Sequence, residues 1–125
     1  MHAGKWLGVA IALGGAATGA WADQLGDVRS KGEIVIGVLG TAEPYSFIDP
    51  TTRELVGYEV DLGKAIAKHL GVKPVFKQLA VAARIPELQQ GRVDVLAAAL
   101  AKTPEREGQI DFSLPTFVTG QTVLV

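Results

Sequence analysis

A change of hydrophobic period along the chain constrains the fold more than any other feature. Residues 33–38, EIVIGV, form an almost unbroken β-branched and apolar run, which indicates a strand covered on both faces. Residues 58–70 instead place Leu62, Ala65, Ile66 and Leu70 at helical spacing, and Gly71 follows as a typical helix end. We therefore expect a strand and then a helix.

The same alternation continues towards the C-terminus. Strands are expected over 73–79 and 93–100, and a helix over 82–91 lies between them. Parallel strands joined by right-handed helical crossovers give an α/β fold, a mostly parallel sheet with helices on both faces. Small molecules bind such sheets at the carboxyl ends of the strands, here after Val38 and after Leu100.

Turn residues divide the rest of the chain. Between the first strand and helix, they predict a hairpin that pairs 45–49 with 54–58. A short helix is expected to start near Pro104, and the β-branched segment 117–125 is predicted to be a strand.

Residues 1–22 have the pattern of a secretory signal peptide. Lys5 supplies a positive start, residues 6–20 are apolar or small, and alanines at 20 and 22 suggest cleavage after Ala22. A membrane anchor is the alternative, but the apolar stretch falls short of the roughly 20 residues that span a bilayer. Residues 23–32 would then form an N-terminal leader.

Composition excludes several classes of site. The chain has no cysteine, so disulfides, thiolate metal sites, a cysteine nucleophile and lipid attachment at cysteine are ruled out. Removing residues 1–22 removes one of 12 basic residues and none of 13 acidic ones, which leaves too little positive charge to grip nucleic acid. His69 is the one histidine after residue 22, and we expect no metal, no cofactor and no catalytic residue.

An anion site is predicted at the turn after residue 100. Thr103 suits a helix N-cap and Pro104 the first helical position, so free N–H groups would meet the guanidinium of Arg106 there. The alternative is a surface ion pair worth about 0–1 kcal/mol. Its possible partners are Glu105, Glu107 and Asp111.

The loop over residues 39–47 is the second candidate. Glu43 and Tyr45 could hold an ammonium group and an apolar side chain of a ligand. Alternatively, Tyr45 and Phe47 face the core of the hairpin and Glu43 is a solvated charge. Asp94 is interpreted as a local cap or pair.

Six segments resemble, in order and spacing, the first lobe of type II periplasmic binding proteins. More narrowly, they are similar to solute-binding protein family 3, the amino-acid-binding subunits of bacterial ABC importers. The resemblance spans residues 32–125, and its segments are GEIVIGV, EPYSFID, LVGYEVDLGKAIAKHLGVK, RIPELQQGRVDVLAAAL, KTPERE and IDFSLPTFVTGQTVLV. It implies lobe 1 over residues 33–116, the start of a hinge strand over 117–125 and an absent second lobe.

The resemblance also implies roles for residues. Arg106 would pair with a ligand α-carboxylate, helped by backbone N–H groups near Ala101 and Thr103. The expected ligand-binding set is Arg106, Thr103, Ala101, Ala99, Glu43 and Tyr45. Ala98, Ala99 and Ala101 stand where many relatives carry hydroxyls, and Ala42 and Val81 stand where they carry aromatic rings, so we expect an apolar, sparse pocket.

The implied function is an exported periplasmic receptor that captures an amino acid or similar carboxylate-bearing solute for the membrane permease of an ABC importer. An enzyme of the same fold, a prephenate or arogenate dehydratase with Glu43 as acid, is one alternative. The sensory ectodomain of a membrane kinase is another. Because the second lobe is expected to be absent, we predict a fragment that binds no amino acid at micromolar affinity by itself.

Overall fold

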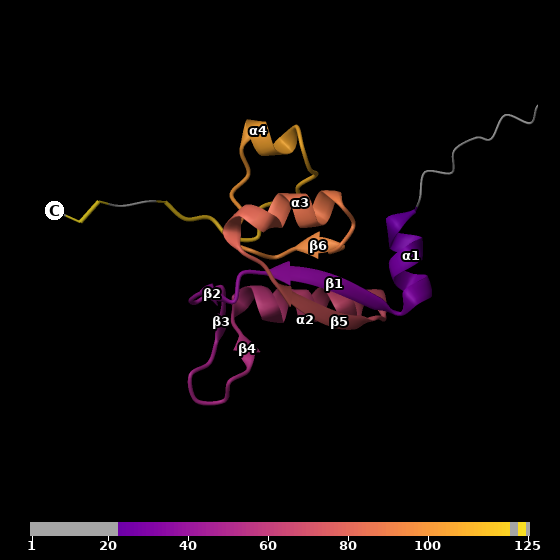
Figure 1. Ribbon diagram of the computed structural model, residues 1–125, viewed down its shortest axis with the longest axis horizontal. Helices are drawn as coiled ribbons and strands as arrows, with labels where there is room; N and C mark the ends of the chain where they lie inside the picture. The colour runs from indigo at the N-terminus through magenta and orange to yellow at the C-terminus, as the bar shows by residue number, and fades with distance from the viewer. Residues whose placement is uncertain (1–22, 121–122, 125) are drawn as a thin grey trace, which may run out of the picture.

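The computed structural model describes residues 23–120 and 123–124, and the predicted signal peptide lies outside them. Figure 1 shows a small α/β unit from which the C-terminal segment extends away. The elements in chain order are α1 (Gln24–Lys31), β1 (Glu33–Val38), β2 (Thr41–Ala42), β3 (Ser46–Ile48), β4 (Leu55–Val56), α2 (Tyr58–Leu70), β5 (Lys73–Gln78), the 3-10 helix η1 (Val81–Ala83), α3 (Arg84–Gln89), β6 (Val95–Leu96) and α4 (Pro104–Glu107).

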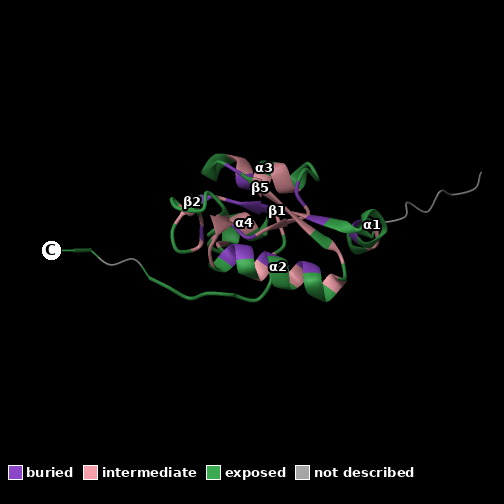
Figure 2. Ribbon diagram, turned by 90° about the horizontal axis from the view of Figure 1, so that it is seen from below, coloured by how far each residue is buried: buried purple, intermediate pink, exposed green. Residues whose placement is uncertain are grey.

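The central sheet is parallel, as predicted. Its strand order is β5-β1-β6, so β1 lies in the middle and pairs with strands on both sides. Figure 2 shows α2 on one face of this sheet and α3 on the other. The predicted α/β architecture with helices on both faces is confirmed.

The core lies around β1 and α2. The buried cluster consists of Val28, Ile34, Ile36, Val38, Ala67 and Ala97. Val28 comes from α1, a helix that the sequence analysis did not predict within the leader segment. Burial of such side chains is the main favourable term in folding, so α1 forms part of the packed unit.

Helix α2 has the predicted bounds. Gly71 ends it in a left-handed conformation, and the N–H of Gly71 donates to the carbonyls of Ala67 and Lys68. The predicted inward face is wrong in one position, because Ala65 is exposed. The fully buried line instead includes Gly63 and Ala67, with Gly63 lying under the Phe76 ring.

The predicted hairpin is confirmed as strands β3 and β4, and β2 adds a third strand to this antiparallel sheet. At its tip, the carboxylate of Asp49 accepts hydrogen bonds from the backbone N–H groups of Thr51 and Thr52. The N–H of Thr52, followed by that of Thr51, holds the pKa of Asp49 below its usual value.

Two strand predictions are wrong in extent. The predicted strand over 93–100 is limited to β6, because beyond Ala97 the backbone groups bond to side chains rather than to a neighbouring strand. Residues 117–120 and 123–124 of the other predicted strand are not in a strand, and Val118 and Leu124 are exposed. Among the described residues, no neighbouring strand pairs with 117–120 or 123–124 to complete their backbone hydrogen bonds.

Within residues 23–120 and 123–124, every helix is too short or too polar to traverse a bilayer.

Candidate functional site

The turn between β6 and α4 has the predicted helix start. The Oγ1 atom of Thr103 accepts a hydrogen bond from the backbone N–H of Arg106 at 3.3 Å, and Pro104 is the first helical residue. The N-cap and proline therefore act as the sequence indicated.

Arg106 is half-buried and turns back onto this same segment. Its Nη1 atom donates to the carbonyl oxygen of Ala101 at 2.8 Å. In the described part of the chain, Arg106 forms no ion pair, whereas Glu107 pairs with Lys102 at 2.8 Å. The surface ion pair that was the alternative role of Arg106 is therefore absent from the described residues.

The beginning of the turn is held by Arg84, a residue that the sequence analysis did not select. Its Nη1 atom donates to the carbonyl oxygens of Ala98 at 2.7 Å and Ala99 at 3.2 Å, and its Nε atom donates to that of Val81 at 2.9 Å. Arg84 is only 8% exposed. Burial, followed by the nearby charge of Arg106, lowers the pKa of Arg84, while Glu59 opposes this shift.

Glu59, at the start of α2, holds the same segment from the other side and is 7% exposed. One carboxylate oxygen accepts from the backbone N–H of Ala99, and the other accepts from the hydroxyl of Ser46 at 3.2 Å. The Ser46 oxygen in turn accepts from the N–H of Gly40 at 3.4 Å. An acidic residue in the first turn of α2 was visible in the sequence, but only the fold brings the turn after β6 to it.

The structure does not gather all the predicted ligand-binding residues. The Ala99 N–H is occupied by Glu59, and Ala101 offers its carbonyl to Arg106. Glu43 is exposed, and the half-buried Tyr45 packs edge-on against Phe117 with ring centroids 5.6 Å apart. Tyr45 therefore contacts the segment after α4, which differs from both of the roles considered for it.

A small cavity of about 280 Å³ lies at the carboxyl ends of β1 and β5, where ligand binding is expected in this sheet type. Its lining residues are Leu39, Thr41, Gln78, Leu79, Ala80 and Val81. The exposed Val81 borders it, and the carbonyl of Val81 is also bonded to Arg84, so the cavity adjoins the turn. Its lining has neither an aromatic side chain nor a charged one.

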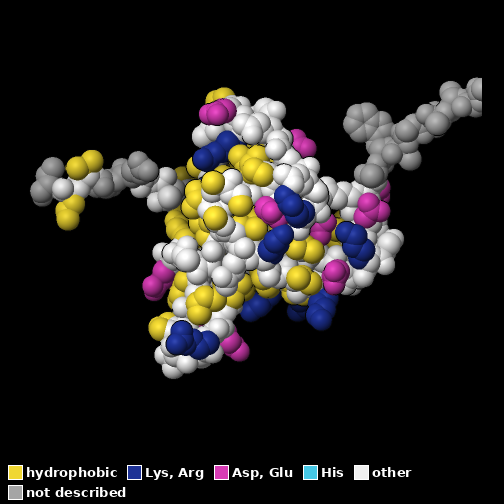
Figure 3. All heavy atoms as spheres, in the orientation of Figure 1, with side chains coloured by type: hydrophobic (Ala, Val, Ile, Leu, Met, Phe, Trp, Pro, Cys, Tyr) yellow, Lys and Arg dark blue, Asp and Glu magenta, His cyan; other side chains and the backbone are white. Residues whose placement is uncertain are grey.

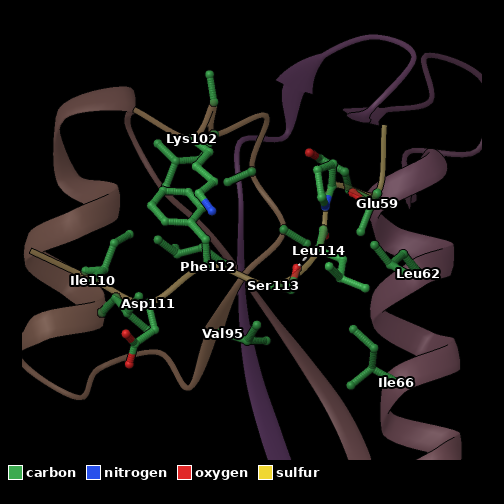
Figure 4. A pocket seen from close by; sticks show the side chains of 18 of the residues that line it. Glu59, Leu62, Ile66, Val95, Lys102, Ile110, Asp111, Phe112, Ser113 and Leu114 are labelled. Atoms are coloured by element: carbon green, nitrogen blue, oxygen red, sulfur yellow. Dashed lines mark hydrogen bonds between the residues drawn. The ribbon is translucent and has the colours of Figure 1, made fainter. Parts of the chain in front are cut away.

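A larger cavity of about 570 Å³ runs along β6 between α2 and the segment after α4. Figure 4 shows Leu62 and Ile66 reaching into it from α2, with Ile110 and Phe112 on the opposite side. This space extends from the edge of the sheet to the turn after β6, because its lining includes Ala98, Leu100, Ala101 and Lys102. We take the small cavity, which lies at the carboxyl ends of β1 and β5, together with the turn after β6 as the candidate binding site.

The surface carries no strong field on the face seen in Figure 3, where Lys and Arg side chains are interspersed with Asp and Glu. Among residues 23–120 and 123–124, no group of histidine and carboxylate side chains is arranged to hold a metal ion. The charged groups around the turn after β6 include Arg84, Arg106 and Glu59, and the last two act on the pKa of Arg84 in opposite directions.

Comparison with known proteins gives a consistent result. The sequence profile of the bacterial extracellular solute-binding proteins, family 3, matches residues 34–125. The chain is 34% identical over 106 residues to the ABC transporter glutamine-binding protein GlnH of Bacillus subtilis, covering 82% of this chain and 39% of that protein. It is 32% identical over 120 residues to the L-cystine-binding protein TcyJ of Escherichia coli, covering 94% of this chain and 45% of that protein.

Solved structures share the fold. The arginine-bound form of domain 1 of TmArgBP matches with a TM-score of 0.70 and 32% identity, over 73% of this chain and 71% of that one. An ancestral cyclohexadienyl dehydratase matches with a TM-score of 0.70 and 31% identity, over 74% of this chain and 38% of that one. The chain spans less than half the length of the two curated relatives.

Proposed function

The chain belongs to the bacterial extracellular solute-binding proteins of family 3, and on that premise we propose that it supplies one lobe of an amino-acid receptor. The receptor captures an amino acid or a similar small carboxylate-bearing solute in the periplasm. It then delivers the solute to the membrane permease of an ABC importer.

Arg106 carries this proposal. It sits at a helix start beside the carboxyl ends of the strands, and within the described residues no carboxylate neutralises it. A guanidinium of this kind can donate a paired set of hydrogen bonds to a ligand carboxylate. The contact with the Ala101 carbonyl uses one of its nitrogen atoms and orients the group.

The adjoining cavity supports an apolar or small side chain on the ligand. Its lining includes Leu39, Leu79 and Val81 and has no charged side chain. A ligand would thus have its carboxylate at the turn and its side chain towards the strand ends.

The test is calorimetric titration of the protein produced from the complete gene, using a panel of the twenty standard amino acids and L-cystine. At least one amino acid should bind. Arg106→Ala should lower its affinity by about 10-fold to 100-fold, since a hydrogen bond to a charged group contributes roughly 1.5–3 kcal/mol. Arg92→Ala is the matched control, because Arg92 pairs on the surface with Glu87 at 3.1 Å. Equal affinities in the wild type and Arg106→Ala would refute the carboxylate role.

The dehydratase alternative is decided with the same protein. The receptor proposal predicts no formation of phenylpyruvate from prephenate. Glu43, the acid considered for such chemistry, is exposed on the loop after β2. Turnover that disappears in Glu43→Gln would replace the receptor proposal with an enzyme.

A further inference from the structure

We propose that Glu59 and Arg84 are positioning residues that together fix the conformation of the turn carrying Arg106. The two side chains hold one short backbone segment, Ala98–Ala99, from opposite sides. Their link to ligand capture rests on the proposed function, whereas their effect on the turn does not.

The acidic half of this arrangement is Glu59. Its carboxylate is buried, and its two oxygens have different partners, the N–H of Ala99 and the hydroxyl of Ser46. A buried charge is unfavourable unless it is hydrogen-bonded, so the carboxylate keeps both partners in place. Because Ser46 also accepts from Gly40, Glu59 connects the loop after β1 with the turn after β6.

The basic half is Arg84. Its guanidinium bonds the carbonyls of Ala98 and Ala99, which are the acceptors left free when β6 ends at Leu96 and the chain leaves the sheet. It also bonds the carbonyl of Val81, so η1 and the turn are held by one rigid fork.

The backbone between these side chains has an unfavourable conformation. Ala99 has a φ angle of +46°, a left-handed value that residues other than glycine rarely adopt. Such a conformation persists where surrounding contacts determine it, and the contacts here are those of Glu59 and Arg84. At its far end the turn is fixed by Thr103 and Ala101, both bonded to Arg106.

Amide hydrogen exchange of the ligand-free chain, read residue by residue by NMR, tests the effect on the turn. Glu59→Asp keeps the charge but shortens the side chain, so it should lower the protection of the Ala99 amide by about 10-fold or more. Glu59→Gln keeps the length and an acceptor oxygen, and protection should stay within about 3-fold of wild type. Asp61→Asn, on an exposed carboxylate of the same helix, is the control.

The other half is tested with Arg84→Lys, which keeps the charge but replaces the planar fork, whose Nε and Nη1 atoms bond different carbonyls, with a single nitrogen atom. The Nε–H signal of Arg106 should shift in Arg84→Lys and in Glu59→Asp, and stay in place in Arg92→Lys. Unchanged protection at Ala99 and an unshifted Arg106 signal would overturn the proposal. So would an equal loss of protection at Ile36 in β1, because that outcome means general destabilisation.

Ligand affinity provides a second readout. L-glutamine, L-cystine and L-arginine are titrated into the complete protein bearing Glu59→Asp, Arg106→Ala or both. Glu59→Asp should weaken binding in the wild-type background and have no further effect with Arg106→Ala, since it acts through the turn. Additive losses would overturn the proposal. Absence of any binding by the wild type would refute the proposed function alone, and the exchange data would still decide the effect on the turn.

Discussion

At the scale of the residue, Ala99 is where the local preference and the fold disagree. An alanine in the left-handed region costs roughly 1–2 kcal/mol relative to an ordinary conformation. Glycine adopts the same φ angle without this cost, although it loses more conformational entropy on folding. The side chain of Ala99 is exposed, so its removal sacrifices little packing.

Ala99→Gly should therefore raise the free energy of unfolding by up to about 1 kcal/mol. Urea denaturation followed by circular dichroism measures the change. Ala98→Gly is the control, because Ala98 is only 2% exposed and does not have a positive φ angle. The free energy of unfolding of that variant should fall by about 1 kcal/mol. A loss of stability in both variants would contradict the assignment of strain to residue 99.

At the scale of the element, the start of α2 depends on a close approach to the hairpin. Gly57 has a φ angle of 127°, and a Cβ atom there would lie 2.4 Å from the carbonyl oxygen of Tyr45. The N–H groups of Tyr58 and Glu59 donate to the carbonyls of Pro44 and Tyr45 across this contact. The hairpin thus supplies the helix with the N-terminal acceptors that a side-chain cap would otherwise provide.

Gly57→Ala should cost about 3 kcal/mol or more, because it combines a forbidden backbone conformation with a clash against backbone. Gly71→Ala, at the other end of α2, provides the comparison. It has a φ angle of 72° and open space around its Cβ position, so only the conformational cost of about 1 kcal/mol is expected. Thermal unfolding would reveal the difference, and similar melting temperatures for the two variants would contradict it.

Glu87, in α3, links β5 and the loop before β6 through its charge. Its carboxylate contacts the Nζ atom of Lys77 at 2.6 Å and the Nε atom of Arg92 at 3.1 Å. The hydrogen bond from Lys77, more than the charge of Arg92, lowers the pKa of Glu87 below its ordinary value of 4.5, while burial opposes this shift. This carboxylate therefore stabilises the fold above pH 4.5 and ceases to do so as the pH falls through its lowered pKa.

Glu87→Gln should lower the melting temperature at pH 7 and leave it nearly unchanged at a pH below the lowered pKa of Glu87, where the wild-type carboxyl is also protonated. Melting curves from pH 7 down to acid unfolding measure this convergence. Glu54→Gln, at an exposed hairpin position, should follow the wild-type curve throughout. A constant difference between Glu87→Gln and wild type at every pH would show that the charge is not responsible.

At the scale of the whole molecule, the cavity of the proposed binding site is small. The cavity at the strand ends holds about 280 Å³, just below the range of about 300–1,000 Å³ typical of small-molecule pockets. Such pockets bury most of the ligand surface, and affinity depends on that enclosure. In the proposed function, Arg106 and its turn orient a ligand without enclosing it.

We predict that the 125-residue chain alone shows no saturable heat with any standard amino acid at micromolar concentration. The arginine-bound domain 1 of TmArgBP provides the opposing case, a single domain with its ligand, of which this chain covers 71%. Calorimetry on the purified chain decides between them. Saturable binding at micromolar concentration would contradict the prediction and assign the affinity to this lobe.

Much of the fold was predictable because its signals are local. The bounds of α2, the hairpin and the Thr103 N-cap all follow from side chains within a few residues of one another. The strand predicted over 93–100 was too long, and the described residues of 117–125 form none, because an apolar or β-branched run states a preference without supplying a partner. A strand persists only where a neighbour completes its backbone hydrogen bonds.

The sequence by itself determined the alternation of strands and helices, the helix start that presents Arg106, and membership of the family. Only the tertiary structure decided what holds that helix start in place. Glu59 lies 40 residues before Ala99 and Arg84 lies 15 before it, so no local spacing connects them. The parallel crossovers bring the starts of α2 and α3 and the end of β6 together at the carboxyl end of the sheet. The buried charged side chains there bond the backbone groups that are left free where β6 ends.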